Sequence, residues 1–442
     1  MSKGKRTVLI GIDGVPYSML EKISNDEVMP NFNSLKDEGV FKQMMASIPD
    51  NSAVSWSSIM TGVNPGEHGV FGFTDLIPKT YTLGFLNFMN MKHKPFWMQK
   101  PNKKYVILNL PFTYPVQEMN GYIISGFVSP DINRSVYPTS IFPYINKLKY
   151  QIDVDSKKAY KSKDIFLDEL FSVHEKRVIA YRYFWDEVDW DTFMIVFTGS
   201  DRLGHFMWDD YENTDNPNHK RFLDYFREID KEIGWISEHL GNKDNLIMMS
   251  DHGMEIIKTE VHLNTYLEQN GFLKLSDGDR KNYNNITNES TAFALEPSRI
   301  YLNYKDRYPN GCVNYEEREN IIEELTDIFR QLKYNDELVI TDVIKKEEIY
   351  EGDQMDVAPD LLLVPNNGYS LRGTVGRKDV FGGDSILTGM HKGSDAFLFV
   401  KGENAETIVP DKPHVEDVVD IMHGLEDYQI MKSQLTALGY ME

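Results

Sequence analysis

The amino-acid sequence predicts an α/β fold with a central, mostly parallel β-sheet flanked by helices. Two observations support this prediction. Short apolar runs recur along the chain, and segments with a helical pattern separate them. Strands that alternate with helices in this way are typical of a parallel sheet covered on both faces.

The apolar runs have the length and composition of strands that are buried on both faces. They are TVLIGI (7–12), YVILNL (105–110), FMIVF (193–197), NLIMMS (245–250), DLLLV (360–364) and AFLFV (396–400). The helical segments between them are 29–39, 218–240, 315–332 and 415–425. We interpret all six runs as parallel strands of the sheet.

We expect a single domain that spans residues 1–442, because a chain of this length can bury a large core and no repeat or low-complexity linker divides it. Two polar segments, at roughly 129–190 and 275–355, are rich in Lys, Asn and Tyr. We interpret these segments as insertions that cap the sheet.

The formal net charge of −21 disfavours nucleic acid or an anionic membrane as the main partner. An anionic substrate would then need local positive charge, and bound metal ions are an obvious source of it. Cys312 is the only cysteine, so an intrachain disulfide and a cysteine-based zinc site are both excluded. The apolar run at the N-terminus is too short for a signal peptide or a membrane span, and we expect a cytoplasmic protein.

Acidic residues and histidines follow the predicted strands. They are Asp13 after the first run, Asp201 and His205 after the third, Asp251 and His252 after the fourth, and His391 in a Gly-flanked loop before the last. Ligands of open α/β sheets bind at the carboxyl ends of the strands, so we expect these side chains to converge. Each alone would be more typical of a turn or a helix cap. Together they predict a site for zinc or manganese.

A set of motifs spans most of the chain: GIDGVPYSML, MPNFNSLKDEGV, SAVSWSSIMTGVNPGEHGVFGF, NLPFTYPVQEMNGYIISGF, SDRLGHFMW, SDHGM and GMHKG. In these motifs the sequence resembles the type I phosphodiesterase/nucleotide pyrophosphatase branch of the alkaline phosphatase superfamily. It looks most similar to the group of predicted phosphohydrolases or phosphomutases of that superfamily. The resemblance implies an alkaline-phosphatase-like three-layer sandwich with cap-like insertions.

The resemblance also implies two divalent metal ions, zinc or alternatively manganese. Carried over by motif, one ion would be held by Asp13, Asp251, His252 and the nucleophile, and the other by Asp201, His205 and His391. In the phosphodiesterase branch the nucleophilic hydroxyl lies ten residues before the Gly of a Thr-Gly pair, and counting back from Gly62 reaches Ser52.

One position departs from the pattern of the nucleotide pyrophosphatases. They carry an Asn three residues after the nucleophile, where it binds a phosphate oxygen, and this chain has Ser55 there. Ser55 is therefore a candidate for a substrate contact. Arg202 and Lys392 are further candidates, because each lies next to a predicted metal ligand in the sequence. The alternatives are that Ser55 bonds to helix backbone and that the two cations are solvated or paired.

The predicted mechanism follows from these residues. Two metal ions would neutralise the charge of a phosphate ester and activate Ser52, which is a weak nucleophile on its own. Ser52 near the N-cap of a helix would also place the phosphoryl group at favourable backbone N–H groups. We expect a phosphoseryl intermediate that water then hydrolyses.

The predicted function is that of a metal-dependent phosphohydrolase, a phosphodiesterase or nucleotide pyrophosphatase-type enzyme that acts on a small phosphate ester. A phosphomonoesterase or a phosphomutase on the same fold is the alternative, and a non-catalytic binding protein that retains the fold is a remote one. The segment SAVSW lacks the Pro and Arg of the sulfatase motif, which disfavours a sulfatase. The sequence predicts no particular oligomeric state.

Overall fold

The computed structural model describes residues 5–277, 280 and 282–437, so the first four residues of the basic N-terminus lie outside the described part. The predicted α/β fold with a mostly parallel central sheet is confirmed. The central sheet has eight strands in the order β2-β20-β9-β1-β8-β5-β6-β7. They are β1 (Thr7–Ile12), β2 (Val40–Met44), β5 (Tyr105–Leu110), β6 (Gly121–Ser125), β7 (Val136–Tyr137), β8 (Thr192–Phe197), β9 (Asn245–Met249) and β20 (Ala396–Lys401).

The five strands from β9 to β6 are parallel, and the strands at both edges of the sheet are antiparallel. Two of the six predicted parallel strands are therefore wrong in direction. The run at 396–400 forms β20, which is antiparallel to both β2 and β9. The run at 360–364 forms β17 (Leu361–Pro365), which belongs to a separate antiparallel sheet. A buried strand is apolar on both faces in either direction, so its pattern does not reveal how it pairs.

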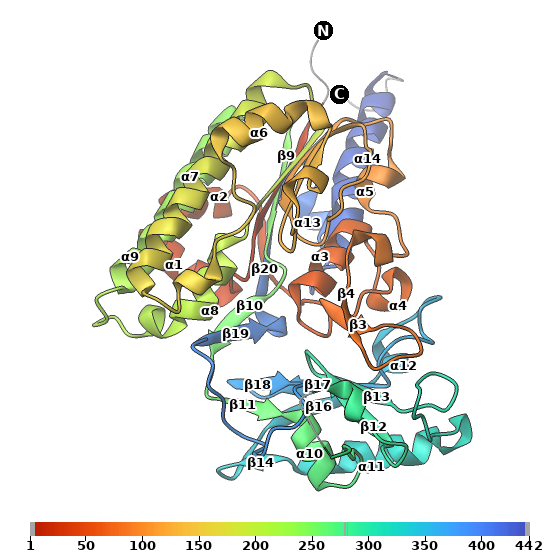
Figure 1. Ribbon diagram of the computed structural model, residues 1–442. Helices are drawn as coiled ribbons and strands as arrows, with labels where there is room; N and C mark the ends of the chain where they lie inside the picture. Colours follow the sequence, from red (N-terminus) through yellow and green to blue (C-terminus); the bar gives the residue numbers. More distant parts are fainter. Residues whose placement is uncertain (1–4, 278–279, 281, 438–442) are drawn as a thin grey trace.

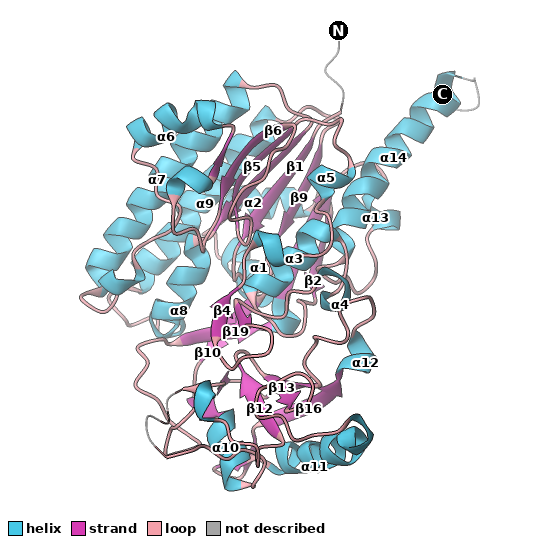
Figure 2. Ribbon diagram, turned by 45° about the vertical axis from the view of Figure 1, so that its right-hand side comes forward, coloured by secondary structure: helices cyan, strands magenta, loops and turns pink. Residues whose placement is uncertain are grey.

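Side chains that alternate across the sheet build one core on each face. Val8, Ile10 and Ile12 of β1 join one core, and Leu9 joins the other. The helices over the first face are α1 (Tyr17–Asn25), α2 (Pro30–Lys36), α6 (Phe142–Leu148), α7 (Lys163–Glu187), α8 (Gly199–Glu212) and α9 (His219–His239). Those over the second are α3 (Ser52–Thr61), α4 (Pro65–His68), α5 (Phe96–Gln99), α13 (Ala405–Ile408) and α14 (Asp417–Ala437) (Figures 1 and 2).

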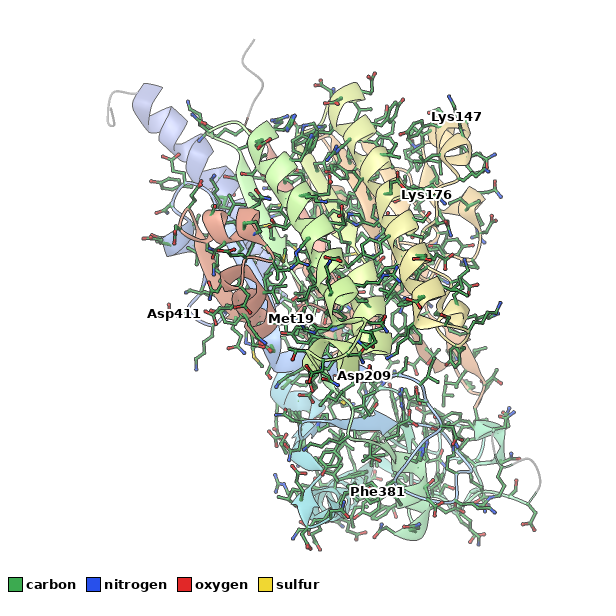
Figure 3. The ribbon with its side chains drawn as sticks, turned by 90° about the vertical axis from the view of Figure 1, so that its left-hand side faces the viewer. Met19, Lys147, Lys176, Asp209, Phe381 and Asp411 are labelled. Atoms are coloured by element: carbon green, nitrogen blue, oxygen red, sulfur yellow. The ribbon has the colours of Figure 1, made fainter. Side chains whose placement is uncertain are left out.

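Figure 3 looks onto the first of these helical layers, in which Lys147 of α6 and Lys176 of α7 are labelled. The predicted helical segments 29–39, 218–240, 315–332 and 415–425 correspond to α2, α9, α11 (Arg318–Gln331) and the start of α14. Within the described residues, no helix has the length and apolar character needed to cross a membrane.

A lower lobe with its own apolar core lies beyond the carboxyl ends of the parallel strands (Figure 1). This lower lobe contains β17 and α11. It also contains β11 (Thr259–His262), α10 (Leu263–Gln269), β12 (Ala292–Leu295), β13 (Arg299–Leu302), β14 (Lys333–Tyr334), β15 (Glu337–Leu338), β16 (Ile340–Lys345), α12 (Lys346–Ile349) and β18 (Tyr369–Arg372). The antiparallel ribbon of β10 (Gly253–Ile256) and β19 (Gly389–Lys392) lies between the lobes, as does the hairpin of β3 (Thr74–Leu76) and β4 (Leu83–Phe85). Short 3-10 helices cover 88–90, 132–134, 139–141, 156–158, 283–285, 315–317 and 393–395.

The two segments predicted as insertions have different surroundings. The described part of 275–355 lies in the lower lobe together with β11 and β18, which come before and after it in the chain. The segment 129–190 contributes α6 and α7 to the helical layer over the sheet. The division of the chain into one domain with two insertions stays a prediction.

Candidate metal centre

Three carboxylates meet at the carboxyl ends of neighbouring parallel strands. Asp13 directly follows β1, Asp251 follows β9, and Asp201 lies in the first turn of α8, just after β8. All three side chains are buried. Gly14 allows this close packing, because its φ is 69° and a Cβ atom there would meet the Asp201 backbone at 3.1 Å.

One oxygen of each carboxylate is held by a hydrogen bond. The Trp56 indole donates to Asp13 Oδ2 at 3.1 Å, and the Gly14 backbone N–H donates to Asp251 Oδ1 at 3.0 Å. The Arg202 guanidinium donates to Asp201 Oδ2 at 3.2 Å. The second oxygens are Asp13 Oδ1, Asp201 Oδ1 and Asp251 Oδ2; each is buried and has no hydrogen-bond donor among the described residues. Buried acceptors of this kind normally have a partner, so these three atoms fit a bound cation.

Three histidines complete the cluster. His252 follows Asp251, His205 lies one helical turn after Asp201 in α8, and His391 is in β19. The pairing of β19 with β10 aligns His391 with Met254 and brings its ring to 3.6 Å from the ring of His252, centroid to centroid.

Each histidine points one ring nitrogen at a backbone carbonyl. The Nδ1 atoms of His205, His252 and His391 lie 2.9, 2.9 and 2.7 Å from the carbonyl oxygens of Gly389, Gly253 and Asp50, respectively. A carbonyl only accepts, so Nδ1 carries the proton and the lone pair of Nε2 faces the carboxylates. In metal-binding histidines, a hydrogen bond from the ring nitrogen that does not bind the metal orients the imidazole in this way.

The Nε2 atoms and the free carboxylate oxygens form two groups that share one residue. Asp201 Oδ1 lies 3.3 Å from His205 Nε2, 3.5 Å from His391 Nε2 and 4.0 Å from His252 Nε2. Asp13 Oδ1 and Asp251 Oδ2 lie 3.9 and 3.2 Å from His252 Nε2. The structure thus brings all six predicted ligands together, and it places Asp201 between the two groups rather than in one of them.

The pKa shifts in the cluster follow from burial and from the neighbouring charges. Burial, Asp251 and Asp201 raise the pKa of Asp13 well above its usual value. Burial would also raise the pKa of Asp201, but His205, His391 and Arg202 lower it well below the usual value. Burial lowers the pKa of His252 to about 4. Oxygen and imidazole ligands in this crowded, buried arrangement fit the donor set of zinc or manganese.

Ser52 lies beside this cluster, as the first residue of α3. The Asn51 side chain accepts a hydrogen bond from the Ala53 N–H, which makes Asn51 the N-cap of α3. Ser52 therefore lies next to the cap, as the sequence predicts. Gly62, with a φ of 74°, ends the helix. Ser52 Oγ is buried and lies 3.0 Å from His252 Nε2. Because Nε2 carries the lone pair, the Ser52 hydroxyl is the donor of this hydrogen bond.

The other hydroxyls of α3 are bonded within the protein, with one exception. Ser57 and Thr61 donate to carbonyl oxygens one turn earlier, both at 2.6 Å. Ser58 Oγ lies 3.1 Å from Nε2 of the His68 ring, and Ser58 Oγ also accepts a hydrogen bond from the hydroxyl of Ser47. Ser55 Oγ is buried and has no partner within the described part of the chain.

The two cations predicted as possible substrate contacts are both paired. Arg202 donates to Asp153 at 2.9 Å as well as to Asp201, and it lies over the Phe127 ring at 4.4 Å. Lys392 forms an ion pair with Glu255 at 3.3 Å.

Several residues that order the cluster were not predicted from the sequence. Trp56 fixes Asp13, Ser200 Oγ donates to the Asp13 carbonyl at 2.6 Å, and Asp153 holds Arg202. Trp56 lies one helical turn after Ser52, which is the one signal in the sequence that it faces the same side. The carbonyls that orient the histidines have no sequence signal, because every residue carries one.

A comparison with known protein families gives a match over most of the chain. The profile of the family described as type I phosphodiesterase / nucleotide pyrophosphatase matches residues 7–394, a span that includes all six clustered carboxylates and histidines and Ser52. The chain belongs to this family. Its members are phosphoester hydrolases. No curated protein sequence matches the chain.

Solved structures resemble this chain along nearly its whole length. Phosphonoacetate hydrolase from Sinorhizobium meliloti 1021, in complex with phosphonoformate, has a TM-score of 0.62 and 14% identity, with 94% of this chain and 95% of that chain covered. Murine ectonucleotide pyrophosphatase/phosphodiesterase 5 has a TM-score of 0.54 and 14% identity, with 96% and 95% covered. The human protein of that name has a TM-score of 0.55 and 16% identity, with 96% and 95% covered. At these identities the similarity establishes the fold.

Proposed function

We propose that this member of the type I phosphodiesterase family hydrolyses a small phosphodiester with Ser52 as the nucleophile and two divalent metal ions as cofactors. The observation that carries the proposal is the position of the Ser52 hydroxyl. It lies at the first residue of α3, 3.0 Å from His252 Nε2, beside three buried carboxylates whose free oxygens lack a donor.

The clustered residues provide two ligand sets. Asp13, Asp251 and His252, together with Ser52, would hold one ion, and His205 and His391 would hold the other, with Asp201 placed to serve either. Zinc or manganese in these sites would neutralise phosphate charge and stabilise the attacking and leaving oxygens. The acid-rich chain has few other sources of positive charge at this point, because Arg202 and Lys392 are each paired with a carboxylate.

The protein's own contribution is to position the nucleophile. Asn51 caps the helix and fixes its first turn, and the hydrogen bond to His252 sets the direction of the Ser52 hydroxyl. Helix α3 is buried along all ten residues, so its N-terminus is held rigidly by packing. The N–H groups of the first turn favour an anionic phosphoryl group at this end of the helix.

The reaction has two displacement steps. Ser52 Oγ forms a bond to phosphorus, the bond from phosphorus to the leaving oxygen breaks, and the leaving group takes up a proton to become an alcohol. The product of this step is a phosphoseryl ester that retains the second substituent of the phosphodiester. Water then attacks the same phosphorus, releases the phosphate monoester and restores the Ser52 hydroxyl.

The comparisons support a small phosphorus-containing substrate. The Sinorhizobium meliloti enzyme has been solved with phosphonoformate and with phosphonoacetate, and an inactive form of the murine protein has been solved with AMP. All three ligands are small anions with one phosphorus atom.

The test is to compare hydrolysis of bis(p-nitrophenyl) phosphate and p-nitrophenyl phosphate by the metal-loaded protein and by two serine variants. We expect the diester to be the better substrate and Ser52→Ala to abolish its turnover while metal content and far-UV circular dichroism stay unchanged. Ser57→Ala is the matched control, because Ser57 is buried in the same helix but donates to the Ala53 carbonyl. Turnover by Ser52→Ala, or a preference for the monoester, would overturn the proposal.

A further inference from the structure

A cavity of about 290 Å³ connects the metal centre with the lower lobe. At one end it is lined by Asn51, His205 and His391. At the other end the lower lobe contributes Glu296, Ser298, Ser370 and Arg372, and the loop at β3 contributes Phe73 and Thr74. An in-line displacement would put the leaving group opposite the Ser52 hydroxyl, beside the residues that would hold the second ion. His205 and His391 belong to that second ligand group, so this cavity is where the leaving group would lie.

Among the residues that the structure describes, the cavity offers no free positive charge. Arg372 is the only described Arg or Lys that lines it, and its Nη2 and Nε lie 2.9 and 3.0 Å from Glu260 Oε1. The Glu260 side chain is mostly buried, so this pair is shielded from water and costly to separate. Lys392, next to His391 in the sequence, is engaged by Glu255.

The cavity does offer a free negative charge. Glu296 is exposed, and its carboxylate has no hydrogen bond or ion pair with any residue that the structure describes. Its backbone is fixed, because the fully buried Arg299 donates from Nε to the Glu296 carbonyl at 3.1 Å. Arg299 Nη2 also donates to the Thr74 carbonyl at 2.8 Å, which ties this wall of the cavity to the start of β3.

Three hydroxyls complete the polar lining. The side chains of Thr74, Ser298 and Ser370 make no hydrogen bonds within the described residues, although all three line the cavity. A hydroxyl can donate and accept, and a carboxylate can accept several hydrogen bonds. Phe73 adds an apolar ring face to the same cavity.

We propose that the leaving group of the substrate is uncharged and rich in hydroxyls, such as a glyceryl or sugar group. The inference rests on the proposed function and narrows it. Glu296 and the three free hydroxyls match the donors and acceptors of a polyol. The negative charge of an anionic leaving group such as pyrophosphate would be repelled by the Glu296 carboxylate, and no free cation among the described lining residues would offset this repulsion. A like-charge contact of this kind disfavours binding of anionic leaving groups.

The experiment uses two substrates that release the same product. The metal-loaded enzyme is given the glyceryl ester of AMP and, separately, ATP; both yield AMP, but one releases glycerol and the other releases pyrophosphate. We expect kcat/KM for the glyceryl ester to exceed that for ATP by about tenfold or more, as one adverse charge contact implies.

Three charge variants test whether the cavity sets this preference. Glu296→Lys should shift the ratio of the two kcat/KM values toward ATP by about tenfold or more. Glu260→Gln should shift it in the same direction, because it leaves the Arg372 charge free. The matched control is Glu289→Lys, which makes the same charge change at an exposed residue of the lower lobe outside the cavity, where Glu289 pairs with Lys274. This variant should leave the ratio of the two kcat/KM values unchanged.

The outcomes separate this inference from the proposed function. A wild-type preference for ATP, or a ratio that does not respond to Glu296→Lys, would overturn the inference while Ser52-dependent hydrolysis of bis(p-nitrophenyl) phosphate stood. Absence of hydrolysis of every diester would overturn both.

Discussion

The Nε2 atoms of His205 and His391 lie 3.0 Å apart, while the Nδ1 atom of each ring faces a backbone carbonyl. Two lone pairs at this distance repel unless a proton or a metal ion lies between them. Burial lowers the pKa of His391, but Asp201 and Asp50 raise it above its usual value overall. The carboxylates around this pair of rings thus favour a bound positive charge, which the proposed metal ions would supply.

Metal binding should stabilise the fold. The free oxygens of Asp13, Asp201 and Asp251 are buried near one another, so a divalent ion relieves their repulsion only in the folded state. Zinc or manganese at about 100 times its dissociation constant should add about 2.7 kcal/mol to the free energy of unfolding. Differential scanning fluorimetry of chelator-treated protein would show this as a rise in Tm, and activity lost on chelation should return with the metal. A Tm that does not respond to either ion would contradict the assignment.

Asp201 and His391 should differ in how much metal their loss removes. Asp201 Oδ1 lies within 4.0 Å of all three Nε2 atoms, whereas His391 belongs to one ligand group. Asp201→Asn should lower the occupancy of both sites, and His391→Ala should leave one ion per chain. Elemental analysis after gel filtration measures the ratio. Equal loss in the two variants would show that Asp201 does not serve both groups.

Trp56→Phe should weaken the anchoring of Asp13. The variant leaves the buried Asp13 Oδ2 without its donor, which costs about 1–3 kcal/mol of stability beyond the loss of packing. Trp97→Phe is the matched control, because Trp97 is buried in the same core and its indole makes no hydrogen bond within the described residues. Urea unfolding of both variants gives the difference. If Trp56→Phe is no more destabilising than Trp97→Phe, the indole hydrogen bond contributes nothing.

His174 should make the protein sensitive to acid. It is buried against the rings of Phe197 and Tyr225, and burial, Arg177 and Lys231 lower its pKa to about 3. Between pH 6.5 and 3 the unfolded chain binds a proton here and the folded chain does not, so stability falls as the pH falls through this window. From pH 7.5 to pH 5 this histidine should account for a loss of about 2 kcal/mol.

His174→Phe tests that assignment, because a phenyl ring fills the same site without a titrating group. Urea unfolding at the two pH values should show a smaller loss of stability in the variant by about the amount predicted for His174. His68, whose pKa burial and His93 lower to about 3, would still contribute to the acid sensitivity of the variant. An unchanged pH dependence would exclude His174 as a source.

The candidate site was largely predictable because its ligands follow strand ends. Asp13, Asp201 and Asp251 each come shortly after a buried apolar run, and parallel strands bring such positions together. The pairing of β19 with β10, which brings in His391, is a long-range contact with no local pattern. Likewise, the sequence does not show that Asp201 lies between both groups, because that depends on where α8 starts relative to β9.

The position of α7 in the fold also depends on long-range contacts. The helix α7 begins at the Ser162 N-cap and carries buried residues over much of its length, yet its sequence is polar enough to resemble an insertion. Several of its polar residues are partners of other elements: Lys163 pairs with Asp210, Lys176 bonds to Gln151, and Arg182 pairs with Glu232. These contacts make a polar segment part of a helical layer, and only the tertiary structure reveals them.

The most direct test of the central claim is to locate the covalent intermediate. Turnover of bis(p-nitrophenyl) phosphate is stopped with acid during the first turnover, and the digested protein is analysed by mass spectrometry. We predict that the peptide with Ser52 carries a p-nitrophenyl phosphoryl group, and that this adduct is absent from Ser52→Ala. An adduct on any other residue, or a burst of p-nitrophenol without an adduct on Ser52, would contradict the account.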